Sequence, residues 1–283
     1  MFPAPIERAA PPLRLLYKIA LPVALLIWLA PIIAVALTSI RGQGDLVAGN
    51  YWGVPSEFQI AENYSAVFTN TPILHYIWNS FRVTIPTVIG AVALSCLAGF
   101  ALGIYRFRLN LAVFFIFVGG NFVPFQILMV PVRDMSLQLG LYNTVTGLVL
   151  FHVAFQTGFC TFFMRNFIRE LPQELIDAAR VEGASEFQIF WKVVLPLVRP
   201  AVAALSVLIF TFIWNDYFWA TVLVQGDASM PVTGGLKTLN GQWVAQWQLV
   251  SAGSIVAALP PVVIFFLMQK HFIAGLTMGA TKG

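Results

Sequence analysis

Charged residues are scarce in this chain. Asp, Glu, Lys and Arg make up 10% of the 283 residues and hydrophobic residues 59%, whereas soluble domains are about a quarter charged. Hydrocarbon offers backbone amides no hydrogen-bond partners, so such a composition has to fold as membrane-spanning helices or as a closed barrel. The long uncharged runs favour helices, and the composition excludes an ordinary water-soluble domain.

Cysteine and histidine are also rare. Cys96 and Cys160 lie in apolar runs without a second Cys or His at metal-ligand spacing, which is typical of buried thiols. His75, His152 and His271 form no catalytic or metal-binding constellation at a readable spacing. The sequence therefore predicts no catalytic, cofactor-binding or metal-binding residues. A membrane enzyme is a disfavoured alternative, since no paired acids or nucleophile–base set supports it.

A phosphate-binding loop is missing as well. ATP hydrolysis needs a Gly-rich cradle that ends in Gly-Lys-Ser/Thr. The nearest segment, TGGLKT at Thr233–Thr238, has Leu236 between Gly235 and Lys237. We expect this chain to hydrolyse no ATP itself. The net charge of +4 comes from basic residues scattered between apolar segments, so nucleic-acid binding is not predicted either.

Six runs are apolar and long enough to cross the hydrocarbon core, which takes about 20 residues. These runs are Ile19–Ser39, Val83–Tyr105, Leu111–Pro131, Thr144–Met164, Pro200–Val224 and Leu249–Met268. The predicted fold class is an all-α polytopic membrane protein with about six transmembrane helices and a cytoplasmic loop between the fourth and the fifth.

Lysine and arginine divide unequally between the two sides of these spans. Of the 16 basic residues, 12 fall on one side, namely Arg8, Arg14, Lys18, Arg106, Arg108, Arg165, Arg169, Arg180, Lys192, Arg199, Lys270 and Lys282. Because basic residues accumulate on the cytoplasmic side, both termini are predicted to be cytoplasmic. The loops Arg41–Arg82 and Gln225–Gln248 are predicted to lie outside.

The ends of the chain complete this organisation. The apolar run after Lys18 is too long for a cleaved signal peptide, so the first span is expected to stay. We expect a cytoplasmic N-terminus over residues 1–18, a transmembrane domain over 19–268 and a cytoplasmic C-terminal tail over 269–283. The tail is too polar and Gly-rich to be expected to continue the sixth span.

The cytoplasmic loop 165–199 is predicted to be structured. It is too long for a simple connection between two helices. Pro172 suits the start of a helix over Gln173–Glu182, and Gly183 can supply the left-handed residue that ends it. The loop therefore begins with a short helix and a tight turn.

A second loop helix is predicted to begin at Ser185. Ser185 and Gln188 have the spacing of a capping box, and Pro196 is expected to stop the helix at about Val194. Helical spacing predicts two faces, one of Phe187, Phe190 and Val194 and one of Leu175, Ala178 and Ala179.

Two interpretations of this helix pair remain open from the residues alone. Small Ala178 and Ala179 would let another protein approach closely, and Asp177 and Glu182 would pair with its basic residues. Alternatively, the helices pack beneath the chain's own spans.

The segment DAARVEGASEFQIFWKVVLPLVRP, Asp177–Pro200, resembles the "EAA" loop of ABC importer permeases. The resemblance implies that the loop is a coupling helix that inserts into a cleft of a separate ATPase. The leading Glu of the family pattern is Asp here, which keeps the charge. The implied docking residues are Asp177, Ala178, Ala179, Glu182, Gly183, Ala184, Leu195 and Pro196, with Phe187 from the aromatic stretch between them.

Further segments resemble the maltose-type carbohydrate permeases, specifically the six-span partner with a Gly-rich C-terminal tail. These segments are Glu62–Phe68, Trp78–Val83, Phe100–Arg108, Trp214–Trp219 and Gln269–Gly283. The resemblance implies a permease subunit of an ATP-driven importer in a bacterial inner membrane, surrounded by membrane lipid. It implies as partners a second permease in a heterodimer, an ATPase dimer that binds ATP and Mg, and an extracytoplasmic binding protein that delivers a carbohydrate. It also implies that the tail reaches toward the ATPase pair.

Asp216 is the only acid inside a predicted span. Charges near the membrane centre are costly and usually face a cavity or a partner, but Asp216 is expected near the outer edge. It is therefore either an interfacial acid, a residue that pins a helix break, part of a sugar path, or the coupling group of an ion-coupled carrier. The absence of an internal repeat disfavours the carrier. The sugar-path hypothesis groups Trp214, Asn215, Asp216, Tyr217 and Trp219.

Overall fold

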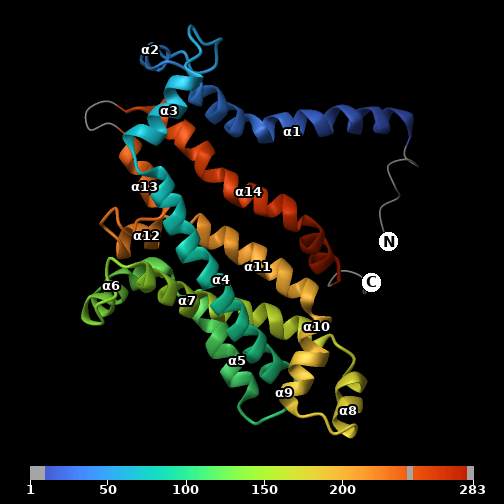
Figure 1. Cartoon of the computed structure of the whole chain (residues 1–283). Helices are drawn as coiled ribbons and strands as arrows, with labels where there is room; N and C mark the ends of the chain where they lie inside the picture. The colour runs from blue at the N-terminus through green and yellow to red at the C-terminus, as the bar shows by residue number, and fades with distance from the viewer. Residues whose placement is uncertain (1–9, 241–244, 279–283) are drawn as a thin grey trace. The chain divides into compact units, whose positions relative to one another are not determined.

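The computed structural model describes residues 10–240 and 245–278, where helices are joined by turns and irregular connections (Figure 1). Four helices are long and apolar enough to span a membrane, or six elements if each of two bent helix pairs is one span. The four are α1 (Pro11–Ser39), α4 (Ile73–Ile104), α7 (Val145–Arg169) and the Trp247–Gln269 part of α14 (Trp247–Met278). Within the described ranges the one β feature is an isolated bridge between Arg41 and Phe58. The all-α, multi-pass prediction is confirmed.

The chain divides into two compact units. The first comprises residues 1–71 and 238–256, and the second 72–237 and 257–283. In the first unit, α2 (Gln43–Val47) and α3 (Ile60–Asn70) follow α1. Its polar centre is the fully buried Arg41, whose guanidinium donates to the carbonyls of Asn50 and Gly53.

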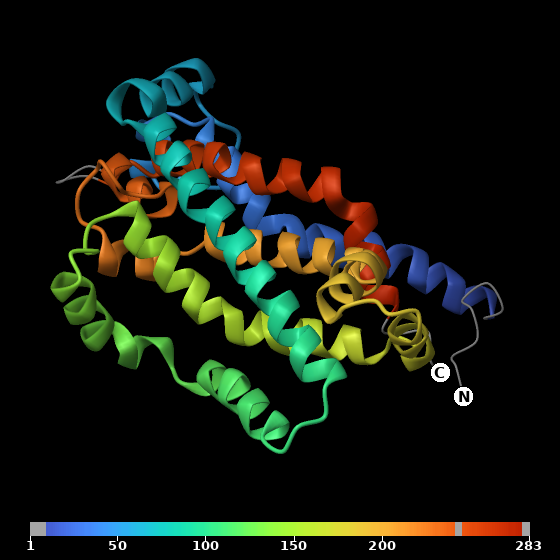
Figure 2. The same cartoon turned by 60° about the horizontal axis from the view of Figure 1, so that its bottom comes forward.

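In the second unit, α4 packs along α7, as Figure 2 shows. Glycine makes this approach possible, because a Cβ at Gly99 would lie 2.9 Å from the backbone nitrogen of Arg165. A Cβ at Gly103 would lie 3.2 Å from Cγ2 of Ile168. The Gly99/Gly103 pair therefore has a packing role, as small residues four apart often do between apolar helices.

The third predicted span, Leu111–Pro131, is not one straight helix. α5 (Asn110–Gly119) and η2 (Gly120–Phe122) form one arm, and η3 (Phe125–Leu128) and α6 (Met129–Gln138) form the other. The two arms are bent by 89°. Pro124 explains the break, because a residue before proline is pushed into extended backbone, and Val123 has φ −77° and ψ 120°.

The fifth predicted span, Pro200–Val224, is also shorter than expected. α11 (Arg199–Trp214) ends ten residues earlier, and α12 (Phe218–Leu223) is a separate short helix. At the other end, α11 is bent by 74° against the Glu186–Leu197 arm. That arm consists of α9 (Glu186–Ile189), the π-helix η4 (Phe190–Val194) and α10 (Leu195–Leu197).

The prediction that Pro196 stops the second loop helix at Val194 is therefore wrong. The arm continues to Leu197, because Pro196 lies in the first turn of α10, where its missing N–H is tolerated. The backbone of α14 continues as a helix to Met278, beyond the candidate span, which ends at Gln269. The last residues of the tail, 279–283, lie outside the described residues.

Candidate functional site

The predicted cytoplasmic loop 165–199 starts later than expected, because α7 continues to Arg169. Its first helix is α8 (Gln173–Val181), one residue shorter than predicted. Gly183 ends the turn after it with φ 82°, in the left-handed region that glycine adopts without strain. The amide of Ala184 donates to the carbonyl of Ala179 at 3.0 Å, and that of Gly183 to the carbonyl of Arg180 at 3.0 Å. The tight turn predicted at Gly183 is confirmed.

The start of α9 is fixed by a complete capping box. The amide of Gln188 donates to Oγ of Ser185 at 3.3 Å, and the amide of Ser185 donates to Oε1 of Gln188 at 2.8 Å. Two backbone donors at the helix end are satisfied in this way. The predicted helix start is confirmed, and the turn between α8 and α9 is held at both ends.

A polar network joins both loop helices to the end of α4. Arg180 donates from Nε to Oε1 of Glu186 at 2.9 Å and from Nη1 to Oδ1 of Asp177 at 3.2 Å. The hydroxyl of Tyr105, which follows α4, donates to Oε2 of Glu186 at 2.5 Å. Burial, with the bond to Glu186, raises the pKa of Tyr105 to about 12. The bond to Glu186 is also the main cause that raises the pKa of Arg180. The loop is thereby held to a predicted span.

Apolar side chains nevertheless remain exposed on this loop. Phe187 is 70% exposed and Val181 90%. We define the exposed loop surface as Leu175, Ala178, Val181, Phe187 and Trp191. Leu175, Val181 and Trp191 were not among the docking residues predicted from the sequence. Their exposure depends on how the loop packs and could not be predicted from the sequence. Their position next to the motif residues was only a weak indication of a role in docking.

The predicted face of Phe187, Phe190 and Val194 does not exist as one surface. Phe190 is 5% exposed and Val194 is fully buried, whereas Phe187 points to the outside of the fold. The π-helix η4 begins at Phe190 and changes the helical spacing, so residues at i and i+7 no longer share a face. Phe187 pairs instead with Trp191, at 6.1 Å between ring centroids.

The remaining predicted docking residues lie around the exposed loop surface. Asp177, Glu182 and Gly183 are exposed, and Ala179, Ala184, Leu195 and Pro196 are half-buried. Leu195 also lines a pocket of about 340 Å³ against α4 and α11, so it contributes to the core of the second unit.

The second candidate region is the break between α11 and α12. The carboxylate of Asp216 accepts hydrogen bonds from the amides of Trp219 at 3.3 Å and Ala220 at 3.0 Å. Its Oδ2 also lies 3.5 Å from Nε2 of His152 on α7. Asp216 therefore pins the helix break by capping α12, one of the roles predicted for it.

A pocket of about 240 Å³ opens beside this break. Its lining residues are Phe125, His152, Phe155, Gln156, Phe212, Ile213, Asp216, Tyr217, Phe218 and Trp219. Asp216, Tyr217 and Trp219 of the predicted sugar path are thus brought together. His152 and Gln156 were missed, because their proximity to Asp216 depends on the packing of α7 and has no signal in local spacing.

The other two predicted path residues lie outside the lining of this pocket. Trp214 is 2% exposed, packs edge-on against Phe81 and donates from Nε1 to the carbonyl of Ala257 at 3.0 Å. Asn215 donates from Nδ2 to the carbonyl of Thr211 at 2.9 Å. Trp214 is a core residue, and the Asn215 amide is used within its own helix end.

Comparison with known proteins adds a family and a fold. Residues 91–278 match the family described as "binding-protein-dependent transport system inner membrane component". A probable ABC transporter permease protein of Pyrococcus horikoshii is 34% identical over 251 residues, 88% of this chain and 91% of that protein. An arabinooligosaccharides transport system permease protein of Halalkalibacterium halodurans is 32% identical, over 89% of this chain and 91% of that protein.

A solved structure shares the fold. It is the crystal structure of a bacterial ABC transporter involved in the import of the acidic polysaccharide alginate, with a TM-score of 0.78 and 23% sequence identity. The match covers 96% of this chain and 99% of the chain compared.

Proposed function

The chain belongs to the binding-protein-dependent transport system inner membrane components and is a permease subunit of an ABC importer, and we propose that its loop α8–α10 docks the ATPase. The exposed loop surface is the observation that carries this proposal. A rigid, doubly capped turn holds Val181 and Phe187 exposed, where they would lose water on contact with a partner. Exposed apolar groups of this kind mark interaction sites.

The docked loop transmits movement through fixed contacts. The Tyr105–Glu186 hydrogen bond ties α9 to the end of α4, and the arm from α9 to α10 leads into α11. When the ATPase pair closes on ATP and Mg²⁺, the loop would move with it and carry α4 and α11. Chemical energy reaches this subunit only through such contacts, since the chain has no Gly-Lys-Ser/Thr phosphate cradle.

The proposed cargo is a carbohydrate delivered by an extracytoplasmic binding protein. The sequence similarity to an arabinooligosaccharide permease supports the substrate class, and the family description supports dependence on a binding protein. We further propose a heterodimer with a second permease. The distribution of lysine and arginine supports cytoplasmic termini.

The pocket beside Asp216 is the proposed wall of the sugar path. Tyr217 is 54% exposed there, and Gln156 and Asp216 offer polar atoms beside aromatic rings. The ion-coupled alternative has no supporting observation, because the Asp216 carboxylate is already engaged by two amides and His152.

ATPase docking is tested with the charge reversal Glu182→Arg in the complete transporter. We expect the variant to insert in the membrane but to lose the ATPase during purification and to lose sugar uptake. Glu57→Arg, an equal charge reversal in the predicted outer loop, is the matched control and should retain the ATPase. Full ATPase co-purification with Glu182→Arg would refute docking of the ATPase by the loop α8–α10.

The sugar path needs a separate test. Asp216→Ala and Tyr217→Ala should lower sugar-stimulated ATP hydrolysis in transporters that still assemble with the ATPase. Normal sugar transport by an assembled Asp216→Ala variant would rule out a path role for this carboxylate.

A further inference from the structure

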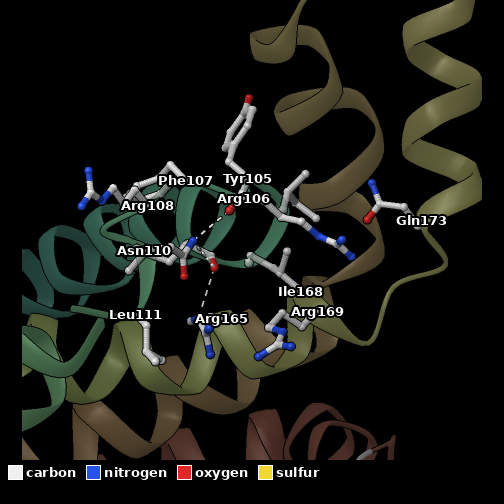
Figure 3. A pocket seen from close by; sticks show the side chains of 13 residues that line it. Tyr105, Arg106, Phe107, Arg108, Asn110, Leu111, Arg165, Ile168, Arg169 and Gln173 are labelled. Atoms are coloured by element: carbon white, nitrogen blue, oxygen red, sulfur yellow. Dashed lines mark hydrogen bonds between the residues drawn. The ribbon is translucent and has the colours of Figure 1, made fainter. Parts of the chain in front are cut away.

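A pocket rich in arginine lies at one end of α4, α5 and α7 (Figure 3). Its volume of about 540 Å³ falls within the range of small-molecule sites, about 300–1,000 Å³. Leu102, Gly103, Ile104, Tyr105, Arg106, Phe107, Arg108, Asn110, Leu111, Arg165, Ile168, Arg169 and Gln173 line it. Four of these residues are arginines and none is acidic. We name it the arginine pocket.

The walls of the arginine pocket are fixed by hydrogen bonds. Asn110 donates from Nδ2 to the carbonyls of Leu102 at 3.1 Å and Tyr105 at 2.8 Å, which holds the connection between α4 and α5 in place. Arg165 donates from Nε to the same Leu102 carbonyl at 3.1 Å, which joins α7 to that connection. Figure 3 shows both sets of bonds.

Arg165 is the central basic group of this pocket. Its side chain is buried, with 8% exposure, and its guanidinium carbon lies 4.0 Å from the ring centroid of Phe114. Among the residues whose side chains the structure describes, 10–240 and 245–269, the Leu102 carbonyl is the acceptor of Arg165, and its two terminal nitrogens have no acceptor there. The guanidinium is therefore available to an anion that enters the pocket.

The other three arginines add positive charge to the pocket and so favour the binding of an anion. Figure 3 shows Arg169 beside Arg165 on α7, Arg106 on the side of Gln173, and Arg108 at the opposite end. No carboxylate of the described ranges forms an ion pair with any of them. Guanidinium groups bind phosphate oxygens bidentately and with charge assistance. We propose that the arginine pocket binds the phosphate group of an anionic phospholipid.

A lipid suits the surroundings better than a solute does. The pocket lies at the ends of apolar helices, where a headgroup would meet the protein. Phe107, Leu109 and Leu111 beside it are 45%, 61% and 58% exposed, which gives acyl chains an adjacent apolar surface. Clusters of Lys and Arg next to transmembrane helices attract anionic lipids of the cytoplasmic leaflet. The shared chemistry, a phosphate group, would also fit free inorganic phosphate.

Binding can be measured on the complete, delipidated transporter by native mass spectrometry. The probes are phosphatidylglycerol, phosphatidylcholine with the same acyl chains, and inorganic phosphate. We expect phosphatidylglycerol to bind at least about tenfold more tightly than phosphatidylcholine. Both headgroups carry a phosphate diester, but the choline ammonium cancels its charge and is repelled by the arginines.

The double variant Arg106→Gln/Arg108→Gln should remove most of that preference. Both residues are exposed and lie in the connection between α4 and α5, so their replacement should not disturb folding. Arg14→Gln/Lys18→Gln removes the same charge from α1 and should keep the preference. Arg169→Gln is a second, independent pocket variant.

The outcomes separate the possible ligands. If added anionic lipid displaces bound phosphatidylglycerol but millimolar inorganic phosphate does not, the pocket is a lipid headgroup site. If millimolar inorganic phosphate also displaces it, the same phosphate site takes a soluble ligand. An unchanged preference in both pocket variants would overturn the proposal. So would a loss of ATPase co-purification with lipid binding intact, since the arginines would then serve the ATPase. Because binding is measured directly, the result does not depend on sugar transport.

Discussion

The loop α8–α10 and the break between α11 and α12 both contain a helix start held by a side-chain hydrogen bond, but they differ in which side chains they expose. Each starts a short helix with a side-chain cap, Ser185 in the loop and Asp216 at the break. In the loop, the cap leaves Phe187 70% exposed, whereas at the break Trp219 is 3% exposed. The cap fixes the backbone in both places, but only the loop presents apolar surface for a partner.

Binding residues and structural residues differ here in how much of their surface is satisfied within the chain. The polar atoms of Asp216 are already satisfied within the chain, and the ring of Trp214 is buried. On the loop, the network of Arg180 and Glu186 satisfies the charges, while the apolar side chains remain without cover. The exposed loop surface is therefore recognised by apolar side chains that remain exposed once the polar groups are hydrogen-bonded within the chain, and not by residue type.

The largest expected effect is a difference in the free energy of unfolding between alanine variants of two phenylalanines that lie three residues apart. Phe190→Ala should lower the free energy of unfolding by about 3–5 kcal/mol, because it empties a buried site. Phe187→Ala should change it by less than about 0.5 kcal/mol but weaken ATPase binding. Thermal unfolding and ATPase titration of the two purified variants measure both quantities. Equal loss of stability would break the distinction between loop surface and loop core.

The next effect concerns the turn between the loop helices. Gly183 has φ 82°, whereas proline requires about −65°, so Gly183→Pro should cost about 3 kcal/mol or more and release the ATPase. Gly140→Pro is the matched control, since Gly140 also has positive φ, 67°, and donates its amide to a carbonyl three residues before it. Retention of the ATPase by Gly183→Pro, or its loss in both variants, would contradict a specific role for the loop turn.

A smaller effect is expected at the helix break. Asp216→Ala should destabilise the fold by about 0.5–2 kcal/mol through loss of the cap. Asp216→Asn keeps a capping oxygen and should preserve most of that stability. Unfolding in increasing denaturant compares the two variants. Equal destabilisation by Ala and Asn would show that the charge facing His152, rather than the cap, matters.

The smallest effect should come from the bond between the loop and α4. Tyr105→Phe removes one hydrogen bond to Glu186 and leaves the ring beside Phe100. We expect a loss of about 1 kcal/mol or less, because the bond is partly exposed to water. The variant should keep the ATPase but need more ATP turnover per sugar transported. Uptake and hydrolysis measured on the same proteoliposomes give this ratio, and an unchanged ratio would remove Tyr105 from the transmission path.

Features that depend on neighbours along the chain could be predicted from the amino-acid sequence. Apolar length gave α1, α4, α7 and α14, and the caps at Gly183 and Ser185 depend on contacts within a few residues. The loop motif could be read because such local bonds require particular residue types at particular spacing.

The exposure of individual side chains and the contacts between distant groups depend on the packing of the helices. Phe190, at the start of the π-helix, is buried whereas Phe187 is exposed, and the packing of α7 brings His152 to Asp216. The arginine pocket likewise joins the connection after α4 to the end of α7. Burial and pairing between distant segments depend on how helices pack, and no local periodicity in the chain encodes that arrangement.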